Sequence, residues 1–290
     1  SMNMSVASNT TAPTPATSVT TYKAPSVLLM GGPGSGKSYS LASVVKAGLD
    51  LFVIGTDPGF EESIFEAARA QGLDRTKIHT KYIAPVKTSF AKLMDNAKQI
   101  NQLSYEALTK LSGNFNKQEY QQWWQLLLTL SDFKDDQGKE WGPVDNWKFD
   151  RALAIDGLSG MNIMAKDFCV GAKPAPHQGE WGMAMDQEER VLLKLCSDVM
   201  CLFILTAHIE REVDEVSGGS RNTVGAIGRK LAPKIPRFFS EVVHTKREGA
   251  AFFWSTMTEM YDLKRRSLPL SDKIPPDFGP IIEAWRKRNG

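Results

Sequence analysis

The sequence predicts an α/β fold with a mostly parallel central sheet flanked by helices. The main observation is that short apolar runs of strand character alternate with segments of helical spacing from residue 26 onward. The first such segments cover residues 26–30, 40–49, 51–56, 61–72 and 78–84. This alternation is typical of βαβ units, which build parallel sheets. A second observation is a glycine-rich loop at residues 31–36, placed between the first predicted strand and the first predicted helix.

Composition limits the possible classes of protein. The chain has 290 residues, ordinary apolar content and a net charge of +2, which predicts a globular protein with a sizeable core. So small a charge does not by itself indicate nucleic acid, a membrane or an acidic substrate. The three cysteines lack paired spacing, and no stretch reaches the roughly 20 apolar residues that span a bilayer. We therefore expect a soluble protein of a reducing cytoplasm, with no membrane partner.

The pattern changes along the chain in a way that predicts its domains. Residues 1–24 are rich in Ser, Thr, Ala and Pro, so we expect a disordered tail. We expect the core of the fold over residues 25–270. Within it, residues 86–148 carry apolar side chains at helical spacing followed by turn-rich sequence, which predicts a helical insertion. The remaining residues, 271–290, are expected to form a C-terminal extension.

The glycine-rich loop carries the motif G-x-x-x-x-G-K-[ST] directly after a predicted strand and before a predicted helix. Its residues, with the next one in the helix, are Gly31, Gly32, Pro33, Gly34, Ser35, Gly36, Lys37, Ser38 and Tyr39. Glycines let backbone N–H groups approach a ligand closely, and a helix N-terminus favours an anion. We therefore expect the loop to bind ATP, with Lys37 on the β- and γ-phosphates and Ser38 as a ligand of Mg²⁺. An ordinary glycine-rich turn is the alternative.

A second magnesium ligand is expected at Asp156. Residues 152–155 are apolar, and this acid closes the predicted strand that they form. Apolar runs that end in an acid are common, and an aspartate that caps a turn is the alternative. Gly157, Leu158 and Ser159 follow, rather than a second acid. The carboxylate that activates water must therefore come from elsewhere in the chain.

The glycine-rich loop at residues 31–36 is called the phosphate loop below, after its expected ligand. In addition to this loop, other segments of the chain resemble the RecA-like recombinase ATPases. The resemblance covers about residues 26–270 and implies a RecA-like P-loop NTPase core. FVIGTDPGFEES resembles the second-strand segment of that family, whose closing acid polarises the attacking water. The matching residue is Asp57, where the family usually has glutamate, and Glu61 or Glu62 is the alternative. LFILTAH resembles the strand whose last polar residue senses the γ-phosphate. The matching residue is His208, where the recombinases usually have glutamine, and a purely structural histidine is the alternative.

Another segment with this resemblance bears on assembly. YDLKRRSLP resembles the basic motif at a strand end that reaches the ATP of the neighbouring subunit. The resemblance implies that Lys264 and Arg266 stabilise charge in trans, in the manner of an arginine finger, and that the chain forms a ring or filament. A solvated basic turn is the alternative.

Three further segments resemble the sequences of small bacteriophage RecA-like ATPases, some of which work in single-strand annealing and recombination. These segments are IDGLSGM, TAHIEREVDEVSGG and GRKLAPKIPRFFSEV. In that architecture the loops at about residues 160–181 and 209–234 face DNA. The tentative DNA-binding residues are Arg221, Arg229, Lys230 and Lys234. An excess of basic residues in this segment can neutralise the phosphates of DNA. Acidic residues precede the segment, however, and no aromatic residues lie between these basic residues to stack on bases. The expectation of DNA binding therefore depends on the resemblance more than on local chemistry.

Together these features lead to two alternative functions. The first is an ATPase, with ATP and Mg²⁺ as cofactors, that acts on single-stranded DNA in recombination, annealing or replication. A phage or host recombination protein would be a further partner, and the compartment would be the host bacterial cytoplasm. The second is a nucleotide-switched assembly or protein-binding module with incidental hydrolysis and no DNA role. The departures from the recombinase pattern at Asp57 and His208 favour this second function.

Overall fold

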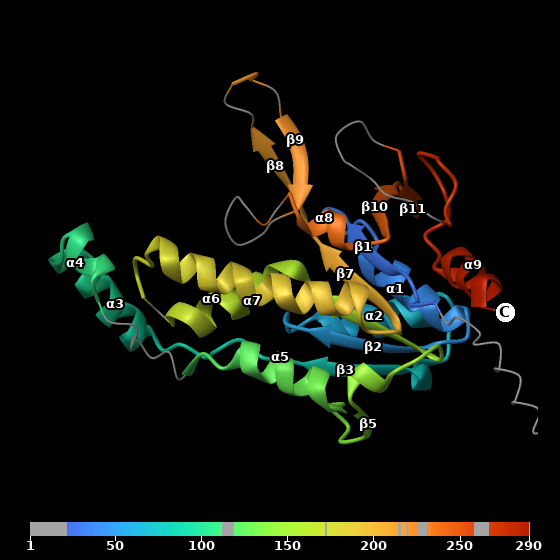
Figure 1. The fold of residues 1–290 in the computed structure, drawn as a ribbon, viewed down its shortest axis with the longest axis horizontal. Helices are drawn as coiled ribbons and strands as arrows, with labels where there is room; N and C mark the ends of the chain where they lie inside the picture. The colour runs from blue at the N-terminus through green and yellow to red at the C-terminus, as the bar shows by residue number, and fades with distance from the viewer. Residues whose placement is uncertain are drawn as a thin grey trace, which may run out of the picture.

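The centre of the computed structural model is a seven-stranded sheet with the order β11-β10-β1-β7-β6-β2-β3 (Figure 1). The structure describes residues 22–111, 119–171, 173–213, 216–218, 220–224, 231, 233–257 and 267–289. The strands of the sheet are β1 (Ser26–Met30), β2 (Asp50–Gly55), β3 (Ile78–Tyr82), β6 (Arg151–Asp156), β7 (Leu202–Ala207), β10 (Glu241–Glu248) and β11 (Ala251–Ser255). All neighbours pair in parallel except β10 and β11. The predicted α/β class with a mostly parallel sheet is confirmed.

Helices cover both faces of the sheet. One face packs against α1 (Lys37–Lys46), α2 (Phe60–Ala70) and α9 (Gly279–Asn289), and the other against α5 (Gln122–Ser131), α6 (Leu158–Val170), α7 (Gln178–Ser197) and α8 (Ile235–Phe238). Alternate side chains of a strand point to opposite faces, so Leu28 and Leu29 of β1 belong to different core clusters. Both are fully buried. A strand covered on both faces has to be apolar throughout, which is why the central strands read as continuous apolar runs.

The region expected as a helical insertion contains helices and a small hairpin. After the short 3₁₀ turn η1 (Arg75–Lys77) and β3 come α3 (Phe90–Gln102) and α4 (Tyr105–Thr109), which project from the body (Figure 1). α3 has no buried residue. α5 follows and packs into the core through the buried Trp123 and Leu126. The hairpin of β4 (Phe133–Lys134) and β5 (Glu140–Gly142) and the turn η3 (Val144–Asn146) complete the region.

One expected loop is wrong. Residues 160–181 were expected to form a loop facing DNA, but most of this segment is helical, because α6 runs to residue 170 and α7 begins at residue 178. Leu158, Met161 and Ala165 are buried at helical spacing and anchor α6 on the sheet. The second expected loop contains an antiparallel hairpin, β8 (Ile209–Val213) with β9 (Ser220–Val224), which stands out from the body (Figure 1).

The two ends of the described chain pack on the same side of the sheet. In the C-terminal extension, Ile281 and Trp285 of α9 are buried against the face that α1 covers. Residues 1–21 of the expected tail lie outside the described residues, whereas Ala24 is buried and its N–H donates to the carbonyl of Met200. No helix in the described ranges has the length and apolar character needed to cross a membrane.

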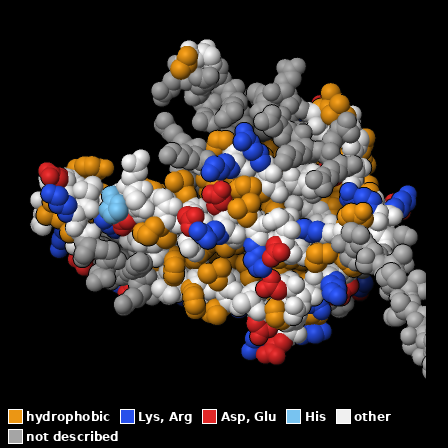
Figure 2. All heavy atoms as spheres, in the orientation of Figure 1, with side chains coloured by type: hydrophobic (Ala, Val, Ile, Leu, Met, Phe, Trp, Pro, Cys, Tyr) orange, Lys and Arg blue, Asp and Glu red, His pale blue; other side chains and the backbone are white. Residues whose placement is uncertain are grey.

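Charged and apolar side chains are mixed on the face seen in Figure 2. Lys, Arg, Asp and Glu side chains are interspersed there, in agreement with the small net charge. Apolar side chains gather over α5, where Trp124 and Leu128 are each 50% exposed. The colouring of this face therefore indicates no large surface of one charge sign among the described residues.

Candidate functional site

The topology of the sheet favours a ligand site at the carboxyl ends of β1 and β7. The chain leaves β1 for β2, which lies beyond β7 and β6. It leaves β7 for β10, the next strand of this sheet, which lies on the opposite side of β1. Ligands of open α/β sheets bind outside the carboxyl ends of the strands where connections diverge in this way. The phosphate loop, which joins β1 to α1, lies at this edge of the sheet.

The phosphate loop has a backbone that only glycine supports at several positions. The φ angles of Gly34 and Gly36 are 68° and 98°, in the left-handed region. A Cβ atom on Gly31 would lie 2.2 Å from Oγ of Ser35 and 2.9 Å from the carbonyl oxygen of Thr245. The glycines therefore allow a tight loop that packs closely on Ser35 and Thr245.

Two features of this loop fit an anion. No side-chain hydrogen bond from the described residues caps the N-terminus of α1, so its first N–H groups remain available as donors. The Oγ atom of Ser35 is buried and has no hydrogen-bond partner in the described part of the chain. A phosphate at this helix N-terminus would accept hydrogen bonds from the free N–H groups and would interact favourably with the helix dipole.

Lys37 is held against the loop. Its Nζ atom donates hydrogen bonds of 2.9 Å to the carbonyl oxygens of both Gly31 and Gly32. An ammonium group has three N–H donors, so one remains for a ligand. Burial lowers the pKa of Lys37, and the negative charge of Asp156 acts in the opposite direction. The cation is therefore partly removed from water beside the loop that is expected to hold phosphate.

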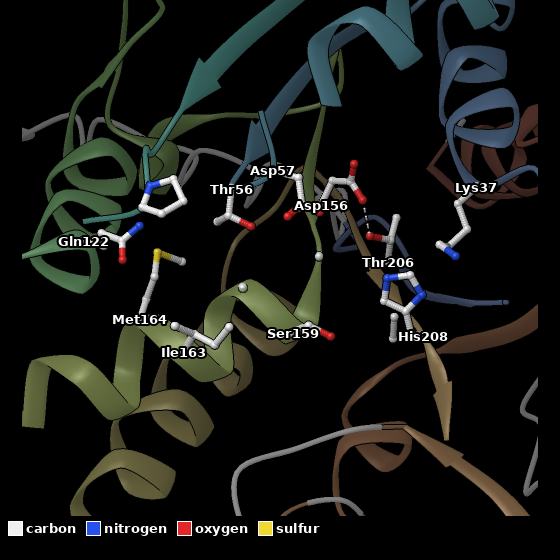
Figure 3. A pocket seen from close by; sticks show the side chains of 14 residues that line it. Lys37, Thr56, Asp57, Gln122, Asp156, Ser159, Ile163, Met164, Thr206 and His208 are labelled. Atoms are coloured by element: carbon white, nitrogen blue, oxygen red, sulfur yellow. Dashed lines mark hydrogen bonds between the residues drawn. The ribbon is translucent and has the colours of Figure 1, made fainter. Parts of the chain in front are cut away.

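Asp156 closes β6 and is fixed from the neighbouring strand. Oγ1 of Thr206, near the end of β7, donates a hydrogen bond of 2.6 Å to Oδ1 of Asp156 (Figure 3). Burial is the largest effect on the pKa of Asp156 and raises it. The Thr206 hydrogen bond and the Lys37 charge lower that pKa, whereas the charge of Asp57 raises it further. A cation bound at this position would favour the ionised carboxylate.

A cavity of about 160 Å³ brings these groups together (Figure 3). Its polar lining includes Lys37, Asp57, Asp156, Ser159, Thr206 and His208. The other end of the cavity is bounded by α5 and α6, through Gln122, Ile163 and Met164. Asp57 and His208 are exposed residues close to the carboxyl ends of strands: Asp57 is separated from β2 by Thr56, and His208 directly follows β7. Residues from five separate chain segments therefore converge beside the phosphate loop.

The geometry distinguishes among the candidate acids. Asp57 lines the cavity, whereas Glu61 accepts a 2.6 Å hydrogen bond from Oγ1 of Thr80 on β3. Glu62 is exposed on α2 and does not line the cavity. Of these three acids, only Asp57 is positioned to act on a group in the cavity.

The structure describes few of the remaining predicted residues. Lys264, Arg266, Arg229 and Lys230 lie outside the described residues. Arg221 belongs to β9, and only its backbone is described. Lys234 is exposed, with its Nζ atom 3.7 Å from Oε1 of Glu189. The predicted roles of these residues in DNA binding and in trans therefore stay predictions.

Three hydroxyl-bearing residues line the cavity but were not among the predicted site residues. They are Thr56, Ser159 and Thr206. Thr206 had a detectable signal, because it is a polar residue inside the apolar run LFILTA. Thr56 had no such signal in the sequence, since what distinguishes it is a close contact with α6. A Cβ atom on Gly160 would lie 2.1 Å from Oγ1 of Thr56, so this glycine lets the helix approach β2.

The predicted magnesium ligands are Ser38 and Asp156, of which Asp156 lines the cavity. Among the described residues, no group of three or more His, Cys, Asp or Glu side chains could hold a metal. Magnesium sites of nucleotide enzymes commonly use one or two protein ligands with substrate phosphates and water. Ser38 and Asp156 therefore stay predicted ligands of a metal that would bind together with phosphates.

Comparison with known proteins adds no assignment, since no family model and no curated protein matches the chain. The functional argument consequently depends on the geometry of the site.

Proposed function

We propose that the protein is an ATPase that binds ATP with Mg²⁺ at the phosphate loop and hydrolyses it in the adjoining cavity. The observation that carries this proposal is that Lys37, Asp57, Asp156 and His208 line one cavity beside the uncapped N-terminus of α1. A loop that donates N–H groups, a partly buried cation and two carboxylates make up the set of groups that phosphoryl transfer to water requires.

Each residue has a distinct task in this proposal. The N–H groups of residues 36–39 and the Lys37 ammonium bind and orient the phosphates. Ser38 and Asp156 would hold Mg²⁺, which supplies neutralisation of phosphate charge when bound. Asp57 orients a water molecule and accepts its proton, since it is one of the residues that line the cavity. His208 donates a hydrogen bond toward the terminal phosphate.

A role on single-stranded DNA belongs to the same proposal, and it rests on the resemblance to RecA-like phage ATPases. One structural feature supports it. The β8–β9 hairpin begins at Ile209, directly after His208, and stands out from the body (Figure 1). A partner that binds this hairpin would be linked through one peptide bond to a residue of the cavity. Assembly into a ring or filament would place the ATP of one chain beside the basic segment of the next.

The decisive experiment is hydrolysis of Mg²⁺-ATP by the purified protein with and without single-stranded DNA. The proposal expects hydrolysis that DNA accelerates and that Lys37→Ala abolishes, because this variant loses the cation on the β- and γ-phosphates. A Lys46→Ala variant is the matched control, because this exposed lysine lies at the far end of the same helix. Lys37→Ala with unchanged nucleotide affinity would contradict the phosphate-loop assignment.

A nucleotide-switched binding module is the second candidate. It is favoured by the short side chain and the exposure of Asp57, which leave the water-activating group weakly positioned. In that case nucleotide would change the oligomeric state or partner binding, as measured by light scattering, while single-stranded DNA would leave the hydrolysis rate unchanged. DNA-stimulated hydrolysis would exclude this second function.

A further inference from the structure

An aromatic surface lies beside the phosphate loop, on the side opposite Asp156. In the sheet order, β7 and β6 lie on one side of β1, and β10 and β11 lie on the other (Figure 1). Because β11 runs antiparallel to β10, its first residues lie at the same edge of the sheet as the loop. Phe252 is the second residue of β11 and pairs with Arg247, near the end of β10. It is therefore level with the phosphate loop and not with the middle of the sheet.

The ring of Phe252 rests directly on the loop. A Cβ atom on Gly36 would lie 2.6 Å from both Cγ and Cδ1 of Phe252, so the ring occupies the space that a side chain at this position would need. Tyr39, in the first turn of α1, packs against the same ring with 5.2 Å between centroids. Both aromatic side chains are partly exposed. The guanidinium group of Arg247 lies 5.7 Å from the centroid of the Phe252 ring.

This surface is held in a fixed position relative to the loop. Oγ1 of Thr245 on β10 donates a 2.9 Å hydrogen bond to the carbonyl of Ser35. Nε1 of Trp254 on β11 donates a 2.9 Å hydrogen bond to Oγ of Ser40 on α1. Trp254 is fully buried, whereas Phe252, two residues earlier on the same face of the strand, reaches the surface. The two hydrogen bonds therefore join the β10–β11 hairpin to Ser35 in the loop and to Ser40 in α1.

We propose that the ring of Phe252 is the surface on which the base of the bound nucleotide stacks. This inference rests on the proposed function, since it assumes that phosphates occupy the loop. Lys37 and Asp156 mark the side of the loop that would hold the terminal phosphate, so the base end of the ligand extends toward β10 and β11. The chemical group that suits a partly exposed aromatic ring with a cation nearby is another flat π-system. Stacking on a ring does not read the edge of the base, so ATP and GTP should bind with similar affinity.

The test compares the affinities of Mg²⁺-ATP and inorganic tripolyphosphate, measured by calorimetry, for the wild-type chain and Phe252→Leu. Leucine still fills the space against Gly36 but offers no ring. We expect Phe252→Leu to bind ATP about tenfold more weakly, and tripolyphosphate as tightly as the wild type does. Phe252→Tyr keeps the ring and should retain ATP affinity. Phe253→Leu is the matched control, because the Phe253 side chain lies on the opposite face of β11. There the Nζ atom of Lys273 lies 5.0 Å from the centroid of the Phe253 ring.

The outcomes separate this proposal from the one on which it rests. Equal loss of ATP and tripolyphosphate affinity in Phe252→Leu would mean that the ring only supports the loop, and would overturn the stacking site. Unchanged ATP affinity in Phe252→Leu would also overturn it. If the wild-type protein binds ATP no more tightly than tripolyphosphate, the stacking site is overturned, whereas the phosphate-loop assignment stands. A wild-type chain that binds neither probe would overturn the proposed function itself.

Discussion

Thr206 donates a 2.6 Å hydrogen bond to Asp156 across the carboxyl ends of the neighbouring strands β7 and β6. This bond orients the carboxylate toward the cavity that also holds Lys37. It joins residues that are 50 positions apart in the chain, and it makes Thr206 a positioning residue for the predicted magnesium ligand.

Thr206→Val removes this hydrogen bond with little change of shape. A hydrogen bond to a charged group contributes about 1.5–3 kcal/mol, so we expect the affinity for Mg²⁺-ATP to fall by about tenfold or more. Thr206→Ser keeps the hydroxyl and should stay near the wild-type affinity. Nucleotide titrations at several magnesium concentrations provide the measurement. The positioning role is wrong if the valine variant shows the magnesium dependence of the wild type.

Asp57→Asn should separate binding from turnover. The amide cannot accept a proton from water, so we expect kcat for ATP hydrolysis to fall by about 100-fold while the nucleotide Kd changes little. Glu61→Gln is the control, because the Glu61 carboxylate accepts a hydrogen bond from Thr80 and does not line the cavity. Steady-state ATPase rates of the two variants show which of the two acids activates water. A large loss of turnover in Glu61→Gln instead would move the water-activating role to α2.

Gly160→Ala should destabilise the fold through a clash between α6 and β2. The added Cβ would lie 2.1 Å from Oγ1 of the buried Thr56, so we expect a loss of about 1–3 kcal/mol in the free energy of unfolding. Gly182→Ala in α7 meets nothing within 4 Å and should stabilise the protein by about 0.5–1 kcal/mol through helix propensity. Urea denaturation of both variants checks the pair. Equal effects would show that helix propensity alone governs both positions.

Glu188 should make the stability depend on pH. It is fully buried in α7, its carboxylate oxygens have no hydrogen-bond partner among the described residues, and burial raises its pKa from 4.5 to about 8. Between these two values the unfolded chain has lost the proton and the folded chain keeps it. The Glu188 contribution is therefore fully present below pH 4.5 and is lost as the pH rises toward 8, by about 1.4 kcal/mol per pH unit.

Glu188→Gln should remove this dependence. Its stability relative to the wild type should improve as the pH rises from 4.5 to 8, as measured by the denaturation midpoint at each pH. Glu189→Gln, next along the helix and paired with Lys234, is the control and should follow the wild type. A wild type and a Glu188→Gln variant with parallel pH profiles would contradict the neutral buried carboxyl.

Lys264 and Arg266 test assembly. If they act on the ATP of a neighbouring subunit, the double alanine variant should bind nucleotide normally but hydrolyse it poorly, because the lost charge acts on the transition state. Adding Lys37→Ala protein, which keeps the basic segment, should restore some activity. An exposed basic turn would instead tolerate both substitutions. Full activity of the double variant, or a defect that no mixture relieves despite proven co-assembly, would remove the intersubunit site.

The sequence by itself determined the class of the fold and the place of the phosphate loop. Continuous apolar runs such as residues 26–30 have to be strands buried on both faces, and Lys37 with its glycines follows directly from such a run. These features depend on neighbouring residues alone, so local patterns were sufficient to predict them. Asp156 was predicted for a related reason, since it closes an apolar run. Asp57 and His208 were predicted from the resemblance to RecA-like recombinase ATPases.

Only the tertiary structure decided which of these groups meet. Three contacts join residues from different segments of the chain. They are the hydrogen bond from Thr206 to Asp156, the hydrogen bond from Thr80 to Glu61, and the packing of Phe252 against Gly36. Strand order and register bring such residues together, and neither is recorded in a local pattern. The helix at residues 158–170 replaced the expected loop for the same reason, because packing on the sheet selects its conformation.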